Sequence, residues 1–422
     1  MDNRFIYIAV LSLFAAFFVF EMPIAFGSTS DFNKTKQLDV TSVSGNPTIS
    51  RTQTLKIVSG DDSTTGTGDI VLDWTNIADE SDIAIYDESG NLLDYYIESF
   101  DATNETATIW VYRDWVRDGS TQAQVAYGDG PSDQSVNAST VFDKESDLRG
   151  GWLLNETSGG ALDVTSNNND GTTNGGVTRG VNGAVDGAYD FDGTNDNVEV
   201  PHDSSLNITG DMTISMKLFI DSYTDGSWDM YVEKASDGYS GYALYSSGSD
   251  NLISFNMGSS SDWYDVSYTI GTGSWHHLVV VHDDSRQETS FYVDNNLVEN
   301  LATNNLDPTY TGSLNVADPS WSDTDLHNGK IDHLTIRSSA ISNEDRTAMY
   351  DSTKSSPDFF SQQAVETTGD GGGAVGGTIG GVWEDDGVSG LNVLLFSALF
   401  LVVSLFVMAG FLKINGSTSD NE

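Results

Sequence analysis

The segment Gly187–Pro201 constrains the fold more strongly than any other part of the chain. Tyr189 and Phe191 alternate with other residues before a polar turn, and a second short alternating run ends at Pro201. A period of two places every second side chain on one face, as in a β-strand with one buried side. Two such runs around a turn of Asp, Asn and Gly predict a β-hairpin.

The turn itself carries oxygen-bearing side chains at Asp192, Asn195, Asp196 and Asn197. Asp, Asn and Gly are favoured in turns for conformational reasons alone. Carboxylate and amide oxygens brought together in a turn are also the ligands that calcium prefers. Two interpretations therefore stay open, a plain turn and a calcium site.

Other segments extend the β pattern. Met212–Ile220 has apolar residues at every second position, which predicts a strand with one face on the core. Leu278–Val281 is continuously apolar, as in a strand covered on both faces. Ser342 precedes Asp345 at the distance of a capping box, which predicts a short helix over Asn343–Tyr350.

Further motifs flank the turn in a characteristic order. They are Gly150-Gly151-Trp152, Asn167–Gly171, Gly273–Leu278, Phe291–Asp294 and Gly329–Leu334. With these motifs, Leu148 to Asp351 resembles the laminin-G-like, concanavalin A-type jelly-roll family. The resemblance implies a jelly-roll domain over about half of the chain. It implies less about function, because this fold is used by lectins, adhesion modules and hydrolases.

The resemblance also bears on the calcium hypothesis. Members of the family hold calcium at the rim of a sheet with an Asp-Asn pair in a turn, and Asp196-Asn197 match that pair. The positions of Asp163 and Asp332 in the family motifs add them as further candidate ligands. Calcium takes six to eight oxygen ligands, so backbone carbonyls and waters would complete the site.

The charge of the chain restricts its partners. The 422 residues carry a formal net charge of −45, with 63 acidic residues against 18 lysines and arginines. Such a surface is a poor partner for nucleic acid. Its self-repulsion is screened in molar salt, where the Debye length is about 3 Å. This pattern is typical of a halophilic archaeon or its viruses, with an ordinary acidic surface protein as the alternative. The absence of cysteine excludes disulfides and thiol catalysis.

Apolar runs stand near both ends. Phe5–Phe20 and the small residues around Phe26 predict a signal peptide over 1–27, with an uncleaved anchor as the alternative. Leu391–Leu412 would extend about 33 Å as a helix, enough to cross a membrane. Lys413 begins a short inner tail, 413–422. We therefore predict a single-pass membrane protein whose N-terminal part is extracellular.

The region before the jelly roll divides into two parts. Residues 28–50 are polar and predict a flexible lead, whereas residues 51–140 contain short alternating runs that predict a small β-sandwich. Ile83–Gly90, Asp94–Glu98 and Ala126–Asp129 resemble an uncharacterised β domain that precedes laminin-G-like modules in prokaryotic surface proteins. This second resemblance implies location and architecture without any assigned chemistry.

After the jelly roll, residues 352–390 contain a glycine-rich stretch that predicts a flexible stalk. The predicted outer part also contains sequons for glycosylation. They begin at Asn33, Asn104, Asn137, Asn155 and Asn207.

Catalytic patterns are incomplete. Glucanases of this fold carry carboxylates at alternate positions of one strand, and Glu145-Ser146-Asp147 begins such a pattern without a final Glu and outside the jelly roll. The histidines lack zinc-binding spacing, and His276 and His277 point to opposite faces of one strand. We predict structural histidines and no enzyme. Trp263 and Tyr264, in a polar stretch, are the candidate ligand-binding aromatics.

The sequence therefore predicts an all-β protein of two β-sandwich domains, the second a concanavalin A-like jelly roll over 148–351. The predicted function is recognition or adhesion at a cell surface or virion envelope, including an attachment spike, with a glycan or envelope glycoprotein as partner. A structural envelope spacer and a glycan-active hydrolase are the alternatives. Ligand, oligomeric state and origin are left open.

Overall fold

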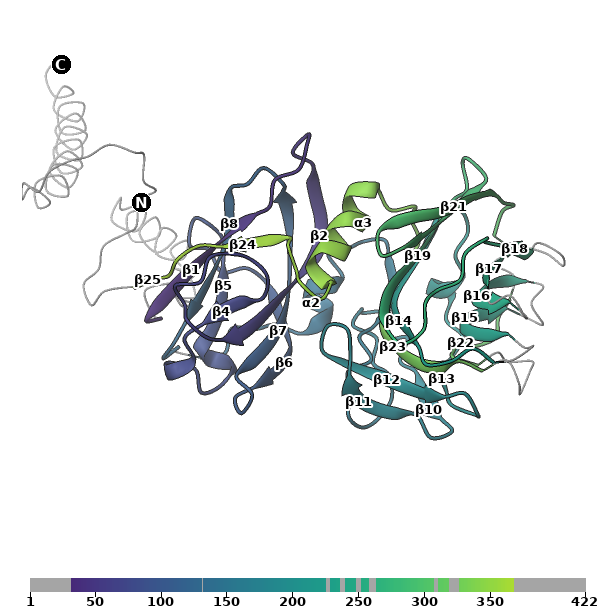
Figure 1. The fold of residues 1–422 in the computed structure, drawn as a ribbon, viewed down its shortest axis with the longest axis horizontal. Coiled ribbons are helices and arrows are strands. Elements are labelled where there is room, and N and C mark those ends of the chain that lie inside the picture. Colours follow the sequence, from purple (N-terminus) through teal and green to yellow (C-terminus); the bar gives the residue numbers. More distant parts are fainter. Residues whose placement is uncertain are drawn as a thin grey trace, which may run out of the picture. The chain divides into compact units, whose positions relative to one another are not determined.

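The computed structural model describes residues 32–130, 132–224, 228–235, 240–247, 252–257, 263–306, 310–318 and 326–367. They all lie in one compact unit, which ends at Asp370, and 371–422 form a second unit outside the described residues. The described chain is mostly strand and forms two β-sandwiches (Figure 1). The predicted all-β fold class is confirmed.

The predicted signal peptide (1–27) and transmembrane helix (391–412) lie outside the described residues. Within the ranges that the structure describes, no helix is long and apolar enough to cross a membrane.

The first sandwich consists of a six-stranded and a four-stranded sheet. The six-stranded sheet has the order β3-β24-β1-β8-β5, with β25 paired to β1. Its strands are β1 Lys34–Val40, β3 Gly66–Thr67, β5 Ile83–Tyr86, β8 Thr121–Tyr127, β24 Phe360–Gln362 and β25 Glu366–Thr367. The four-stranded sheet has the order β4-β2-β7-β6, from β4 Ile70–Leu72, β2 Thr48–Ser59, β7 Thr106–Val116 and β6 Tyr95–Asp101.

The start of this sandwich corrects the predicted flexible lead, 28–50. Strand β1 lies within that range, and its Leu38 and Val40 are fully buried. Lys36 is also buried, and its ammonium donates to the backbone carbonyls of Asp62 and Val71, both at 2.8 Å. These bonds satisfy the ammonium, so a strand of polar composition is accommodated inside the domain.

The end of the sandwich corrects the predicted order of domains. Strand β24 follows the jelly roll in sequence but pairs with β1, with Val40 opposite Phe360. The Phe360 ring packs edge-to-face on Trp115 at 5.0 Å between centroids. The jelly roll is therefore inserted between β8 and β24 of the first sandwich, and the described part of the predicted stalk contains two strands of the six-stranded sheet, β24 and β25.

The jelly roll has an eight-stranded and a seven-stranded sheet. The eight-stranded sheet has the order β11-β12-β23-β14-β19-β20-β21, with β9 paired to β23. Its strands are β9 Leu148–Trp152, β11 Thr178–Asn182, β12 Gly187–Asp192, β14 Met212–Ile220, β19 Trp275–Asp283, β20 Glu288–Val293, β21 Asn296–Ala302 and β23 Asn328–Arg337.

The seven-stranded sheet has the order β10-β13-β22-β15-β16-β17-β18. Its strands are β10 Thr172–Asn174, β13 Asn197–Val200, β22 Leu314–Val316, β15 Asp229–Ala235, β16 Gly241–Ser247, β17 Leu252–Met257 and β18 Trp263–Asp265. The core between the sheets includes Phe191, Met216, Leu244 and Phe255. The alternation predicted for Met212–Ile220 is confirmed, since Ile214, Met216 and Leu218 all lie in this core.

The predicted hairpin at Gly187–Pro201 is wrong in its pairing. Strands β12 and β13 exist, but β12 pairs within the eight-stranded sheet and β13 within the seven-stranded sheet. The turn between them is thus a corner that carries the chain from one sheet to the other. A hairpin within one sheet and a corner between two sheets have the same local pattern of two strands and a turn. The pattern therefore does not specify the partner strand.

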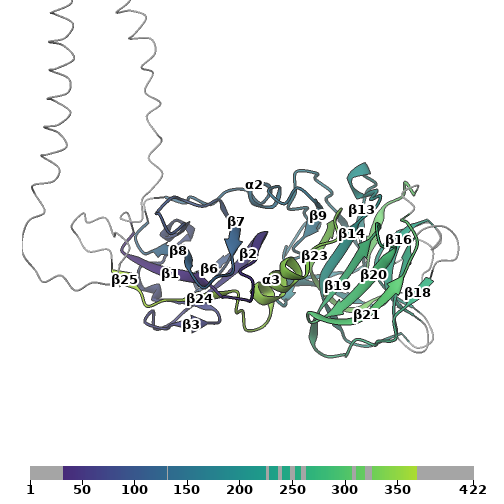
Figure 2. The same ribbon diagram turned by 90° about the horizontal axis from the view of Figure 1, so that it is seen from above.

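Helices are short. They are η2 Trp74–Asn76, η3 Glu80–Asp82, α2 Ala138–Phe142, η4 Ser204–Leu206 and α3 Asn343–Thr353. The predicted helix is confirmed as α3, where the Ser342 hydroxyl accepts from the Asp345 N–H at 2.9 Å. Helix α3 contacts β2 and lies beside the eight-stranded sheet in both views (Figures 1 and 2).

Candidate functional site

The outer face of the seven-stranded sheet carries a row of polar side chains, which we call the polar row. Cross-strand pairing joins Glu199 to Asn315, Asn315 to Glu233, Glu233 to Ala243, and Ala243 to Asn256. The members of the row come from five neighbouring strands, about 4.8 Å apart in an antiparallel sheet. The row therefore crosses most of the width of the sheet.

The strand period explains why these residues share one face. Their neighbours along the chain, Val198, Val232, Leu244 and Phe255, are buried in the core between the sheets. Since successive side chains alternate across a strand, the residues between them point to the opposite face. Polar residues at these positions are thus directed away from the core.

The polar row is ordered by hydrogen bonds. The Asn315 amide donates to Glu233 Oε2 at 3.1 Å, and Ser313 donates to Glu199 Oε1 at 2.8 Å. Glu233 is 0% exposed and Asn256 3% exposed, although both lie outside the core of the jelly roll. A buried carboxylate costs free energy unless it is hydrogen-bonded, so these contacts hold the row in place.

Aromatic and further polar groups lie beside the row. Trp228 and Tyr245 pack at 5.8 Å between ring centroids, with Met230 in the same small cluster. In the next pair of strands, Ser254 donates to Asp265. Burial raises the pKa of the Tyr245 hydroxyl well above its ordinary value, so the group stays protonated. The face combines acceptors, an amide and aromatic rings, which suits a ligand with many hydroxyl groups.

The predicted ligand-binding aromatics lie at the edge of the same sheet. Both belong to strand β18 rather than to a loop, and Trp263 pairs with Asn256 of the polar row. Tyr264 packs against the core of the jelly roll, and its hydroxyl accepts from the Asn304 N–H at 3.0 Å. The Tyr264 side chain is therefore a structural one, and the Trp263 side chain lies outside the described residues.

The four predicted metal ligands of the turn lie together at the sheet-to-sheet corner. Asp196 is 3% exposed and its carboxylate accepts from the backbone N–H groups of Asp192, at 3.1 Å, and Gly176. Asp192 accepts from the Thr194 N–H at 2.8 Å, and Asn197 donates to Asp318 at 3.0 Å. Asn195 is exposed. Asp196 thus acts as a brace for the corner.

The other two metal candidates lie elsewhere, Asp163 in the segment after β9 and Asp332 in strand β23. Asp163 accepts from the N–H groups of Gly151, at 3.0 Å, and Asn169, at 2.9 Å. Asp332 accepts from the N–H of Ala184 at 2.8 Å and pairs with His333. Within the described ranges, no three His, Asp or Glu side chains are grouped as a metal site. The six candidates do not converge, and calcium at the turn stays a prediction.

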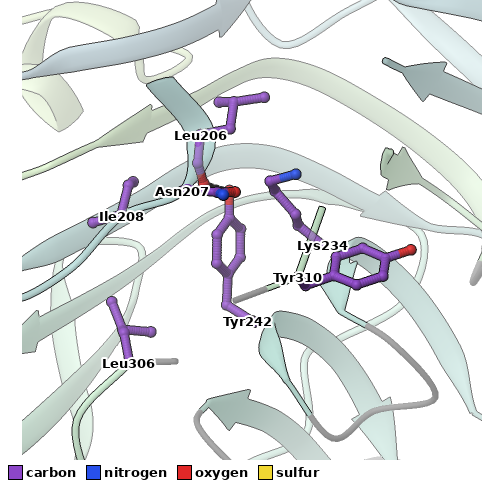
Figure 3. A pocket seen from close by; sticks show the side chains of 8 residues that line it. Leu206, Asn207, Ile208, Lys234, Tyr242, Leu306 and Tyr310 are labelled. Carbon is purple, nitrogen blue, oxygen red and sulfur yellow. Dashed lines mark hydrogen bonds between the residues drawn. The ribbon is translucent and has the colours of Figure 1, made fainter. Parts of the chain in front are cut away.

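The five sequons differ in exposure. Asn33, Asn104 and Asn137 are exposed, whereas Asn155 and Asn207 are half-buried. Glycosylation stays a prediction at all five positions. Asn207 lies beside Lys234, Tyr242 and Tyr310 around a small pocket (Figure 3). This pocket has a volume of about 10 Å³, room for no more than about one water molecule, and is too small for a sugar.

Two family models match the chain. The model of the concanavalin A-like lectin/glucanases superfamily matches residues 192–345. The model of a domain of unknown function, DUF2341, matches residues 79–158. The predicted concanavalin A-like domain is thus confirmed, and the DUF2341 match covers part of the first sandwich and the beginning of the jelly roll. No curated protein matches the chain.

Solved structures resemble part of the chain. The binding domain of Paraclostridial Mosquitocidal Protein 1 is 13% identical with a TM-score of 0.42, over 49% of this chain and 52% of that one. Domain 4 of an extracellular arabinanase from Geobacillus stearothermophilus, in complex with arabinotriose, is 18% identical with a TM-score of 0.38, over 48% of this chain and 98% of that one. The chain thus spans about half the length of the first of these structures.

Proposed function

We propose that the jelly-roll domain recognises a glycan, free or on an envelope glycoprotein, at the polar row. The observation that supports this proposal is the row itself. Glu233, Asn315 and Asn256 lie outside the hydrophobic core, yet they are buried and aligned across neighbouring strands. They support the exposed end of the row, where the Glu199 carboxylate is held by Ser313 and accepts hydrogen bonds from ligand hydroxyl groups with little further loss of side-chain freedom.

The wider proposal places this recognition domain at a cell surface or on a virion, as an adhesion protein or attachment spike. The acidic composition and the apolar runs at 5–20 and 391–412 support it, and so does the lack of a complete catalytic carboxylate pattern. A spacer that binds nothing and a glycan hydrolase are the two outcomes that would replace it.

The test is binding of the full chain to an array of envelope polysaccharides and glycoproteins. Glu199→Gln, at the exposed end of the polar row, keeps the shape of the side chain but removes its charge, and we expect it to weaken binding about tenfold or more. Glu344→Gln, at an exposed position of α3, is the matched control and keeps the affinity of the wild type. Melting curves of both variants separate lost binding from lost folding.

Two results would contradict the proposal. Wild-type protein that binds no glycan or glycoprotein supports the spacer. Release of reducing sugar from a bound polysaccharide supports a hydrolase instead of a recognition domain.

A further inference from the structure

A cavity of about 50 Å³ lies on the opposite side of the jelly roll, against its eight-stranded sheet. Its walls come from β14, β19 and β23 of the jelly roll, from α3, from β2 and β7 of the first sandwich, and from the segment after α2. It therefore lies where the two sandwiches contact each other. One water needs roughly 10–15 Å³ by this measure, so the cavity has room for about three or four water-sized groups.

Lys217, in the cavity wall, is a buried lysine without a direct counter-charge. It is 5% exposed, on β14, directly opposite His277 of β19. Among the described residues its ammonium has no hydrogen-bond or ion-pair partner. It makes a cation–π contact with Tyr350, 5.7 Å from the ring centroid. A buried ammonium in this position loses its hydration without full compensation.

The nearby carboxylates are already paired. Asp332 and Asp294 act on Lys217 electrostatically, but Asp332 pairs with His333, and Asp294 pairs with His276 at 2.7 Å. Glu145, the carboxylate in the cavity wall, binds Arg337 at 2.9 Å. None of these acids forms a direct contact with the lysine in the described part of the chain.

Two more wall atoms are buried with neither a hydrogen-bond nor an ion-pair partner in the described structure. They are the hydroxyl of Thr52 and Nδ1 of His277. Nε2 of His333 also lacks a hydrogen bond, but it lies 3.6 Å from the carboxylate of Glu98. Burial lowers the pKa of His277 well below its ordinary value, so the ring is neutral. Its Nε2 lies 2.8 Å from the Ser215 hydroxyl, and when Ser215 donates, the ring proton is on Nδ1. The cavity then presents an ammonium, an N–H and an O–H as donors.

The charges of the wall are unusual for this chain. Lys217, Arg337 and His333 line the cavity with only Glu145 as a carboxylate. Burial opposes the charge on His333, but Asp332 and Glu98 outweigh it and raise its pKa to about 10. Three of the wall residues are thus cationic near neutral pH, in a chain with 63 acidic residues and 18 lysines and arginines.

We propose that this cavity is a binding site for a small anion, held by the Lys217 ammonium with His277 and Thr52 as further donors. The volume suits a halide with one or two waters, or a small carboxylate or oxyanion. The anion supplies the counter-charge that Lys217 lacks. Because the wall contains residues of both sandwiches, a bound anion stabilises their contact.

The proposal has a pH signature. Burial lowers the pKa of Lys217 to about 8, and Asp332 and Asp294 oppose this effect. Above this pH the free cavity is increasingly uncharged at Lys217, so the affinity for the anion falls, by about tenfold per pH unit. The other ionisable groups beside the lysine or in the cavity wall are Tyr350, His277, His333, Arg337 and Glu145. Arg346 acts on His277 and Glu98 acts on His333.

The experiment compares sodium bromide and sodium chloride with sodium gluconate, whose anion exceeds the cavity, at equal ionic strength and pH 7. We expect the small anions to raise the melting temperature of the full chain in a saturable manner. At ten times the dissociation constant, linkage predicts a rise of about 2 °C for a folded unit of this size. Lys217→Met keeps the apolar stem but removes the charge. It should abolish the difference in melting temperature between the halide salts and gluconate.

Lys234→Met is the matched control. Lys234 is 1% exposed and burial lowers its pKa to about 8, as for Lys217, but its ammonium donates to the Gly312 carbonyl at 2.8 Å. This variant should lose stability in all three salts while it keeps the difference between them.

The proposal is overturned if the wild type melts at the same temperature in all three salts, since the cavity then holds only water. It is also overturned if Lys217→Met keeps the anion effect, because the anion then binds elsewhere. Should Lys217→Met fail to fold, bromide anomalous scattering from crystals of the wild type decides. A peak in the cavity supports the site, and an empty cavity refutes it.

Discussion

Arg337 of the jelly roll donates to Glu145 at 2.9 Å, and neither side chain is more than 4% exposed. The same carboxylate lies 3.3 Å from Arg51 of the first sandwich and accepts from the Thr52 N–H at 2.7 Å. Burial opposes the ionisation of Glu145, but the two arginines outweigh it and hold its pKa below the ordinary value. Glu145 therefore connects the two sandwiches through buried charge.

Glu145→Gln should lower the free energy of unfolding by about 3–5 kcal/mol, because it leaves the buried Arg337 without a counter-charge. Arg51 keeps its ion pair with Asp147 at 2.6 Å. Denaturation by urea measures the loss. Glu88→Gln, which breaks the more exposed pair with Arg113, is the control and should cost less than about 1 kcal/mol. Equal losses for the two variants would show that Glu145 has no special role.

Phe360→Ala tests the closure of the first sandwich by the segment after the jelly roll. Phe360 is 4% exposed and packs on Trp115 and on Phe359, at 4.8 Å between centroids. The cavity left by the missing ring should cost about 3–5 kcal/mol in chemical denaturation. Glu366→Ala, at an exposed position of β25, should stay within about 0.5 kcal/mol of the wild type. A small effect of Phe360→Ala would mean that the returning strand is dispensable.

His333→Asn should reduce stability in a pH-dependent way. The pKa of His333 is raised to about 10, so its charge stabilises the folded protein fully below the ordinary histidine pKa of about 6.5. That contribution disappears as the pH rises from about 6.5 to about 10. The deficit of the variant should therefore shrink over this window in melting experiments. Asparagine suits the backbone φ of 51° at this position.

His282→Gln serves as the control for this pH dependence. Burial lowers the pKa of His282, so the ring is uncharged in both states above about pH 7. The loss of stability of His282→Gln relative to the wild type should not change between pH 7 and 10. If the deficits of both variants follow the same curve, His333 is not the charged group that we infer.

Asp192→Asn tests the calcium prediction better than a change at Asp196, whose carboxylate braces the corner by itself. If the turn binds calcium, a chelator should lower the melting temperature of the wild-type full chain by mass action. The variant should melt at the same temperature with and without chelator. A wild type that is insensitive to the chelator and shows no heat of calcium binding would leave the turn a structural corner.

Low salt should destabilise the protein because of its net charge of −45. Lowering sodium gluconate from about 1 M to about 0.1 M lengthens the Debye length from about 3 Å to about 10 Å, so surface carboxylates repel each other more strongly. The melting temperature should fall, and by the same amount in Lys217→Met. A melting temperature independent of gluconate would contradict adaptation to high salt.

Features encoded within a few residues were predicted from the sequence. The alternation of Ile214, Met216 and Leu218 determines which face of β14 is buried. Ser342 determines where α3 begins. Both features depend only on residues that are close together in the sequence. The motifs of the jelly roll were recognisable for the same reason. These signals establish the class of fold and the approximate extent of the second domain.

Pairings between distant segments were decided by the tertiary structure alone. Glu233 and Asn315 are 82 positions apart, and Arg51 and Asp345 are 294 apart, so no local pattern connects them. The polar row, the insertion of the jelly roll and the cavity at Lys217 all depend on which strands become neighbours. Sheet pairing uses the same backbone groups in every strand, so the choice of partner follows from the burial of the whole chain.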